Sequence, residues 1–208
     1  MKKLLLPLLF ITTNVVANPQ PIAQAFVYEC SDGYNFIASL EEDEIWLFLP
    51  KETVNLKQVP SASGTKYSKG STVYWTKGDK ATLNIGKVAH KDCKNNKAKA
   101  LWETAKLNGA DLRAVGNEPA WNLEISEGQK LLFITDMGKS RYEFPKSERI
   151  ANPSKRTTNY ESRNDKHQLK VLINGESCSD SMSGELFESK VTVTFDEKIF
   201  NGCGKALH

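Results

Sequence analysis

The chain has 208 residues, of which 39% are hydrophobic and 25% are charged. This balance is typical of a globular protein and excludes wholesale disorder and a polytopic membrane protein, and the length allows one large domain or two small ones. The 28 Lys and Arg residues nearly balance the 25 Asp and Glu residues. A chain with so little net charge is a poor generic binder of nucleic acid.

Residues 1–17 have the pattern of a secretory signal peptide. Two lysines precede an apolar run at residues 4–11, and the small-residue sequence VVA at 15–17 stands before Asn18. The apolar run is too short to cross a bilayer, which takes roughly 20 residues. The first cysteine, Cys30, lies too far along the chain to become a lipid-modified first residue. We therefore expect a soluble periplasmic protein that begins at Asn18.

The four cysteines form an even count, which an exported protein usually pairs in disulfides. Of the three possible connectivities we prefer Cys30 with Cys93 and Cys178 with Cys203, because each bridge then stays within one half of the chain. On the loop-entropy model these bridges stabilise the two halves by roughly 4 and roughly 3.5 kcal/mol. A zinc site is the alternative, but the sequence has no CxxC pair. We expect no bound metal.

The segment from residue 26 to residue 60 reads as short strands and turns. Residues 26–30 alternate in character, and the Asp-Gly pair at 32–33 predicts a hairpin turn before residues 34–38. The runs at 45–49 and 53–59 each end at a proline. Consecutive strands of this kind are typical of a small barrel or sandwich.

A second hairpin follows, and its register can be predicted from parity. Val73 and Trp75 must share a face with Ala81 if one side of the hairpin is core. Pairing Trp75 with Ala81 leaves the three-residue loop 77–79. This register places Lys77 at an exposed tip.

After Cys93 the apolar spacing becomes helical. Ala98, Leu101, Trp102 and Ala105 recur at helical intervals, with an asparagine at 95 or 96 as a possible cap and a glycine just beyond the end. The pattern predicts a short amphipathic helix that joins two β domains. We place these domains at residues 18–97 and 98–208.

Strands return in the second half of the chain, which makes the whole protein all-β in class. The expected strands begin at Leu112 and include residues 120–125, 131–135, 140–144, 169–173 and 191–195. The polar segment from Pro145 to Lys166 reads as a long loop with one short strand near Tyr160.

Candidate catalytic groups are sparse. The SGTK sequence at 63–66 matches the S-x-x-K spacing of penicillin-binding enzymes, but the SDN and KTG partners of those enzymes are absent. His90, His167 and His208 show no metal-binding spacing, and we expect each of them to be solvated. We therefore expect neither an enzyme nor a bound cofactor.

The barrel-like segment carries a recognisable signature. The sequence SASGTKY at 61–67, followed by VYWTKGDKATL at 73–83 and closed by Cys93, resembles the SGxxY and [FY]W-x-KG-xx-A-x-L motifs of the MliC/PliC family of bacterial inhibitors of C-type lysozyme. The resemblance covers residues 26–93. It implies an eight-stranded antiparallel barrel tied by the Cys30–Cys93 bridge.

The same resemblance implies the site. Ser63 and Lys77 match the family positions that enter the lysozyme active-site cleft, and Gly64 and Tyr67 belong to the same lysozyme-binding motif. The chain departs from the membrane-anchored members of the family because it lacks their lipid-attachment cysteine.

Residues 98–208 resemble a second, uncharacterised bacterial envelope domain, whose family implies no activity. The resemblance rests on Trp102, RAVGNEPAW at 113–121, CSDSMS at 178–183 and the Gly-Cys pair at 202–203. Within these motifs we expect Gly116 and Pro119 to form turns and Trp121 to lie in the core. Glu118 and Asp180 are candidate ligands, but hydrogen bonding is the expected role of both.

Inhibition of a lysozyme has a simple chemical basis. A retaining lysozyme cleaves between two carboxyl groups about 5 Å apart, one of them protonated. A lysine ammonium beside the acid favours its ionised form, and a serine hydroxyl can donate to a carboxylate. The acidic run 41–44 is suited to the encounter with a basic lysozyme.

Two alternatives remain open. One is an envelope scaffold or small-ligand binder whose function resides in residues 98–208. The other is a cell-wall hydrolase or transpeptidase, and the SGTK sequence at 63–66 is the only feature of the sequence that supports it.

Overall fold

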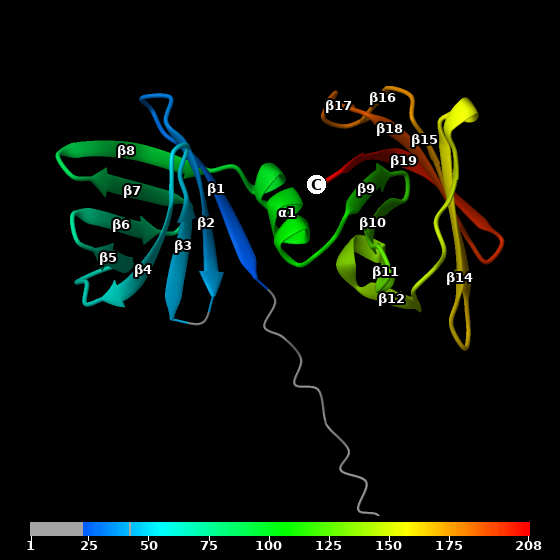
Figure 1. Ribbon diagram of the computed structural model, residues 1–208, viewed down its shortest axis with the longest axis horizontal. Coiled ribbons are helices and arrows are strands. Elements are labelled where there is room, and N and C mark those ends of the chain that lie inside the picture. Colours follow the sequence, from blue (N-terminus) through cyan, green and yellow to red (C-terminus); the bar gives the residue numbers. More distant parts are fainter. Residues whose placement is uncertain (1–22, 42) are drawn as a thin grey trace, which may run out of the picture.

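The computed structural model describes residues 23–41 and 43–208. The predicted signal peptide at 1–17 and the predicted mature start at Asn18 lie outside the described residues. In the described part, a closed eight-stranded antiparallel barrel is followed by one α-helix and a nine-stranded sheet (Figure 1). The predicted all-β class, with an N-terminal barrel and a helix before a second β-rich part, is confirmed.

The barrel is built from strands that pair with their neighbours along the chain, and β8 closes it by pairing with β1. The strands are β1 (Gln24–Glu29), β2 (Asn35–Glu41), β3 (Glu44–Phe48), β4 (Thr53–Val59), β5 (Thr65–Lys69), β6 (Thr72–Lys77), β7 (Lys80–Ile85) and β8 (Val88–Asn95).

Consecutive connections in such a barrel lie at alternate ends. The β4–β5 loop (residues 60–64), the β6–β7 turn (residues 78–79) and the ends of β2 and β3 therefore share one end, which we call the mouth. The β1–β2, β5–β6 and β7–β8 turns lie at the other end, which we call the base. The mouth is the end from which β8 runs on to the helix.

An aromatic core fills the barrel. Tyr28 and Phe36 face each other across the predicted first hairpin, and their rings stack with centroids 5.1 Å apart. The turn of that hairpin holds Gly33 at a φ of 81°, as the Asp-Gly pair predicts. Tyr74 donates a 3.0 Å hydrogen bond to the Tyr28 hydroxyl, which satisfies a phenol that is 1% exposed.

The predicted register of the second hairpin is wrong by one residue. Thr76, not Trp75, pairs with Ala81, so the connection is a two-residue turn that begins with Gly78. Tyr74 is the buried aromatic residue, whereas Trp75 is 39% exposed. The reason is that the Tyr74 hydroxyl finds a partner inside the barrel. Lys77 still lies exposed beside the turn, as predicted.

The predicted helix is present as α1 (Lys97–Leu107). The Asn96 side chain caps it by accepting a 3.1 Å hydrogen bond from the N–H of Lys99. The apolar stripe is shorter than predicted, because Leu101 is 57% exposed while Ala105 is buried.

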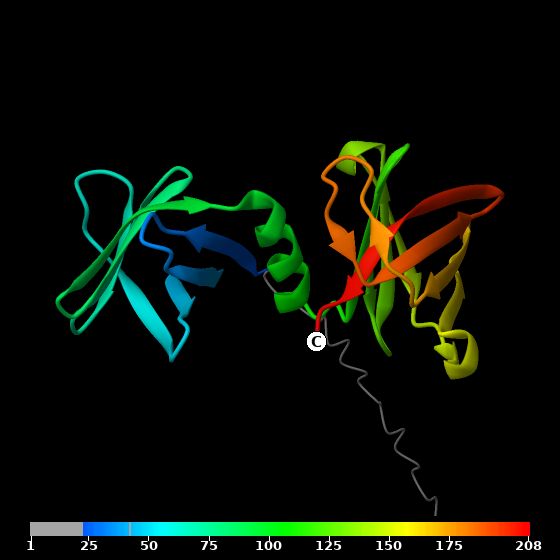
Figure 2. The ribbon, with the colours of Figure 1, turned by 90° about the horizontal axis from the view of Figure 1, so that it is seen from above.

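Helix α1 contacts both β structures, between which it lies in Figure 2. On the barrel side, the hydroxyl of Thr104 accepts a 3.0 Å hydrogen bond from the N–H of Ala25. On the other side, the ring of Trp102 packs 5.2 Å from that of Phe187 and lies under the cation of Lys205 at 4.9 Å. The domain boundary at residues 97 and 98 stays a prediction.

The second sheet has nine antiparallel strands. In spatial order they are β12 (Ser140–Pro145), β11 (Lys130–Thr135), β10 (Ala120–Ser126), β9 (Leu112–Asn117), β19 (Lys198–Ala206), β18 (Ser189–Phe195), β15 (Gln168–Asn174), β14 (Thr157–Arg163) and β13 (Ile150–Asn152). A separate pair is formed by β16 (Cys178–Ser179) and β17 (Leu186–Phe187). The curled sheet encloses its own core, which includes Leu123, Phe133, Val171 and Val193.

One feature of this sheet agrees with prediction and another differs. The strand expected near Tyr160 in the polar segment from Pro145 to Lys166 is present as the seven-residue strand β14. Within it, Tyr160 is buried and donates a 2.8 Å hydrogen bond to Glu127. Strand β19, which has glycines at 202 and 204, is not among the strands expected from the sequence. Gly202 lets β19 lie against β9, where a Cβ atom would collide with the Val115 carbonyl.

The predicted disulfides are both confirmed. Cys30 is bonded to Cys93 and Cys178 to Cys203. The first bridge joins the residue after β1 to β8 within the barrel, and the second joins β16 of the separate pair to β19 of the nine-stranded sheet. Each bridge therefore stays within one half of the chain, as predicted.

Candidate functional site

The two segments singled out by the sequence motif lie side by side at the mouth. Strand β5 pairs with β6 so that Thr65 stands opposite Thr76. The residues just beyond this pair, Gly64 and Lys77, therefore face each other. The segments that carry Ser63 and Lys77, which are fourteen positions apart in the sequence, thus form one continuous edge.

Gly64 is the closest point of contact between the segments. Its φ of 65° lies in the left-handed region. A Cβ atom at this position would collide with the carbonyl oxygen of Thr76 and would stand 3.1 Å from the Cβ atom of Lys77. Only glycine lets the loop lie directly on the hairpin.

The carbonyl group of Ser63 is held by two donors. The indole N–H of Trp75 donates to it over 2.8 Å, and the Ser61 hydroxyl donates over 2.8 Å. Ser63 itself is exposed, and both bonds use its carbonyl and not its hydroxyl. The loop therefore has a fixed backbone and an available hydroxyl.

The hairpin tip carries positive charge and is tied to the helix. Lys77 and Lys80 pair across the ends of β6 and β7, and both are exposed. In the turn between them, the carbonyl of Asp79 accepts a 2.9 Å hydrogen bond from the N–H of Asn95. The Asp79 carboxylate lies 2.8 Å from the ammonium of Lys97. The Lys77 tip is thus anchored where the barrel leads into α1.

A pocket of about 290 Å³ opens at the mouth between these segments. Tyr67 lies in its wall and is 5% exposed, with its ring centroid 6.0 Å from that of Tyr74. Burial, with a smaller effect from Asp43, raises the pKa of the Tyr67 hydroxyl. Tyr67 therefore supports the site from inside the barrel, whereas Ser63, Gly64 and Lys77 form its surface. The remaining pocket residues are Phe26, Tyr28, Leu40, Ile45, Thr65, Thr76 and Gly78.

The S-x-x-K reading has the wrong local structure. Ser63 stands in a loop that leads into strand β5, and Lys66 lies on that strand opposite Trp75. In penicillin-binding enzymes the same spacing is helical, which brings the lysine back to the serine. The strand geometry at this position does not reproduce that arrangement.

The histidines are not all solvated, so that expectation is corrected. His90 is 9% exposed, because its ring stacks on Tyr34 at 3.8 Å and its Nδ1 lies 2.7 Å from the Asp32 carboxylate. The hydrogen bond with His90 lowers the pKa of Asp32. This pair lies at the base of the barrel, away from the mouth.

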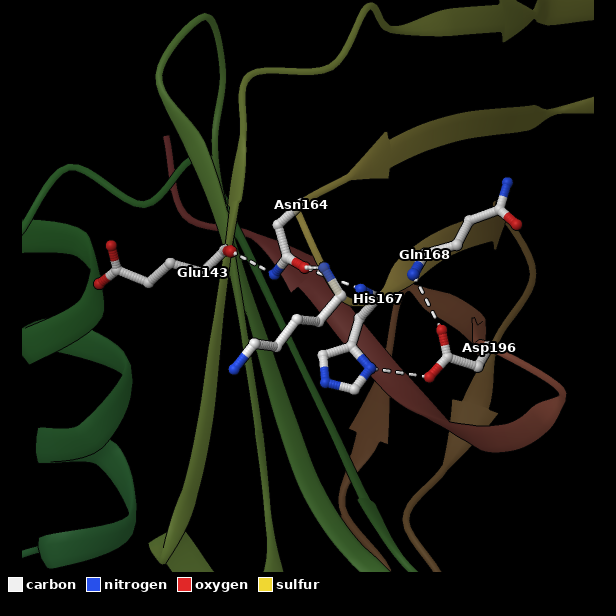
Figure 3. A network of polar contacts seen from close by, with 6 residues as sticks. Glu143, Asn164, His167, Gln168 and Asp196 are labelled. Carbon is white, nitrogen blue, oxygen red and sulfur yellow. Dashed lines mark hydrogen bonds and ion pairs between the residues drawn. The ribbon is translucent and has the colours of Figure 1, made fainter.

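A second pair of this kind is shown in Figure 3. There the Nδ1 atom of His167 lies 2.8 Å from the Asp196 carboxylate, which also accepts a 2.9 Å hydrogen bond from the N–H of Gln168. Asn164 closes the turn by accepting from the N–H of His167 and donating to the carbonyl of Glu143. Asn164, His167, Gln168 and Asp196 belong to the turns between β14 and β15 and between β18 and β19 or to their strand ends, which indicates a role in folding.

The motifs of the C-terminal part are also explained by packing. Asp180 accepts hydrogen bonds from Asn117, Met182 and Ser183, in line with the expected hydrogen-bonding role. Trp121 is 4% exposed, which confirms its core position. Gly116 is not a turn residue, since it lies in β9, where a Cβ atom would collide with the Trp121 indole.

The sequence reasoning missed Trp75 as part of the site. The predicted register places Trp75 in the core. Only one of the adjacent aromatics Tyr74 and Trp75 can face inward, and the alternation of the strand does not determine which of the two it is.

Among residues 23–41 and 43–208, no group of three or more His, Cys, Asp or Glu side chains is arranged to hold a metal ion.

The barrel thus carries a hydrogen-bonded loop and a lysine-bearing hairpin side by side at its mouth. Residues 28–92 match the MliC family model, described as membrane-bound lysozyme-inhibitor of c-type lysozyme. The match covers less than half of the chain, but it confirms the resemblance of the barrel. Searches of curated proteins and of solved structures found no match.

Proposed function

We propose that the protein is a soluble periplasmic inhibitor of C-type lysozyme, which inserts the Ser63 loop and the Lys77 hairpin into the active-site cleft. The observation that carries this proposal is the contact at Gly64, which joins the two motif segments into one edge at the mouth. The family match of residues 28–92 names the partner class.

The chemistry of the edge suits this partner. An ammonium placed beside the general acid of a lysozyme favours the ionised carboxylate, which can no longer donate its proton to the leaving group. The available hydroxyl of Ser63 can donate to the second carboxylate. Because Ser63 and Lys77 come from adjoining segments, they can address two carboxyl groups that are about 5 Å apart.

Gly64 and Tyr67 contribute to binding in different ways. Gly64 provides the backbone conformation that brings the loop onto the hairpin. Tyr67 fills the barrel beneath the edge and keeps β5 in place. We assign a direct contact with lysozyme to Ser63, Gly64 and Lys77, and a supporting role to Tyr67.

The acidic residues at the ends of β2 and β3 also lie at the mouth. Glu41 and Glu44 pair there, and Asp43 lies between them in the sequence. A basic lysozyme would meet this negative charge as it approaches the edge, which favours the encounter. The effect would fall with ionic strength.

For localisation, we propose export by the signal peptide at 1–17 and release in soluble form. Within residues 23–41 and 43–208, none of the helical structure is long and apolar enough for a membrane span. Inhibition of lysozyme in the periplasm would protect the cell wall and so serve evasion of host defence.

The test is a titration of the purified chain from Asn18 to His208 into a C-type lysozyme assay. Full inhibition at one inhibitor per lysozyme supports the proposal. The matched pair of variants is Lys77→Glu at the mouth and Lys87→Glu, which makes the same charge change in the β7–β8 turn at the base. If the parent leaves lysozyme active, the proposal fails and the alternative of a function in residues 98–208 takes its place.

A further inference from the structure

We propose that Trp75 is a positioning residue for the binding edge: its indole N–H holds the Ser63 carbonyl and so fixes the loop before lysozyme arrives. This inference rests on the proposed inhibitor function. It gives a role to an aromatic residue that the packing of the barrel core does not require.

Trp75 is placed on the outside of the barrel, where 39% of it remains exposed. Its Nε1 atom lies 2.8 Å from the Ser63 carbonyl oxygen and would stand 3.1 Å from a Cβ atom at Gly64. The polar edge of the indole therefore lies directly against the loop. A tryptophan can bury its ring partly while its N–H finds an acceptor, as it does here.

Only one of the two donors to Ser63 can anchor the loop. Ser61 belongs to the same loop and would move with it. Trp75 belongs to strand β6, which is paired on both sides within the closed barrel. The indole bond is therefore the link between the loop and the rigid scaffold, alongside the packing of Gly64.

Such a link matters because the loop is made of small residues, Ser61, Ala62, Ser63 and Gly64. A chain of this composition has much conformational freedom to lose when it enters a cleft. Order that exists before binding reduces that loss and strengthens association. The placement of Trp75 thus acts on affinity through Ser63, without contact with lysozyme.

The experiment uses Trp75→Phe, with Trp46→Phe as its matched control. Trp46 is 36% exposed on β3 of the same barrel, and within the described residues its indole has no hydrogen bond. We expect Trp75→Phe to weaken inhibition about 2- to 10-fold, the range of one neutral hydrogen bond. We also expect faster amide hydrogen exchange at residues 62–65 in the free protein. Trp46→Phe should change neither, and melting curves show that both variants fold.

A double variant separates positioning from direct contact. If Trp75 acts through Ser63, Trp75→Phe should weaken inhibition less in the Ser63→Ala background than in the parent. A full additive loss with unchanged exchange at 62–65 would mean that Trp75 touches lysozyme itself, and this would overturn the positioning role. So would unchanged inhibition together with unchanged exchange.

The two proposals fail in different ways. If no form of the protein inhibits lysozyme, the inhibitor function is wrong, but the exchange measurement still decides whether Trp75 orders the loop. If the parent inhibits and Trp75→Phe leaves the loop amides as protected as before, the inhibitor function stands and the role of Trp75 is refuted.

Discussion

Gly64 lies so close to Thr76 that a Cβ atom on Gly64 would collide with the Thr76 carbonyl oxygen. This contact brings the loop after β4 onto the hairpin of β6 and β7. Two short segments thereby become one binding edge, and the edge depends on the absence of a side chain at a single position.

Gly64→Ala should therefore reduce inhibition at least tenfold, because the loop must move away from Lys77. The positive φ adds a strain of about 1–2 kcal/mol. Gly70→Ala is the control, since Gly70 lies at the base and also has a positive φ, 56°, but a Cβ atom there would meet nothing within 4 Å. Inhibition constants and melting curves for both variants check the prediction. Equal inhibition by the two variants would contradict the contact as the basis of the edge.

Lys77 should be the most sensitive charge on the barrel. Lys77→Ala removes a charged partner from a desolvated carboxylate, which typically costs about 2–5 kcal/mol, or about 30-fold to several thousandfold in affinity. Lys77→Glu should be worse, because it adds like-charge repulsion. Neither change should lower the melting temperature appreciably, since Lys77 is exposed. Lys77→Glu with parental inhibition would refute the active-site mechanism.

Ser63→Ala should cost less than either change at Lys77. A hydrogen bond to a charged acceptor contributes about 1.5–3 kcal/mol. The loop itself should keep its conformation, because its hydrogen bonds use the Ser63 carbonyl. Ser71→Ala, an exposed serine at the base, is the matched control for inhibition titrations. A loss at Ser63 no larger than that at Ser71 would remove the hydroxyl from the mechanism.

The sequence predicts the barrel well, because alternation and an Asp-Gly turn are local signals. The sequence-based prediction of the hairpin register fails where either of two adjacent side chains could face the inside of the barrel. Tyr74 and Trp75 are both large and aromatic, and the choice between them is made by the Tyr28 hydroxyl on a distant strand. In the second sheet, β19 is not among the expected strands, because a glycine-rich segment has little strand propensity of its own and pairs only when its neighbours are in place.

In the candidate site, too, the sequence alone predicts some features, and others depend on the folded structure. From their residue types alone, Ser63 and Lys77 are a loop serine and a hairpin lysine, and only the family resemblance marks them. Their contact through Gly64 and the anchoring of Ser63 by Trp75 are properties of the folded barrel. No local sequence pattern predicts the Gly64 contact or the hydrogen bond from Trp75 to Ser63.

The proposed boundary between residues 97 and 98 leads to a prediction about fragments. A fragment of residues 18–97 ends at the start of α1 and loses the hydrogen bond from Ala25 to Thr104. A fragment of residues 18–109 keeps the whole helix and should be more stable, with both fragments retaining inhibition. Melting curves and lysozyme titrations of the two fragments test this. If the shorter fragment is as stable as the longer one, the helix does not support the barrel.

Acid should weaken the loop that follows β16, because the Asp180 carboxylate accepts its hydrogen bonds fully only when it is ionised. The backbone N–H of Ser183, followed by the Ser183 hydroxyl, the Asn117 amide and the N–H of Met182, lowers the pKa of Asp180 despite some desolvation. A folded-state pKa below the unfolded value of about 3.9 gives stability that is present above that value and is lost as pH falls through the folded pKa.

Asp180→Asn should therefore destabilise the chain at pH 7, and the difference from the parent should shrink as the pH is lowered from about 4 toward about 2. Urea unfolding at a series of pH values measures this difference. Asp165→Asn, at an exposed position in the turn after β14, serves as the control and should show a smaller difference at pH 7. A parent–variant gap at Asp180 that stays constant over the whole acid range would show that its ionised carboxylate does not hold the loop.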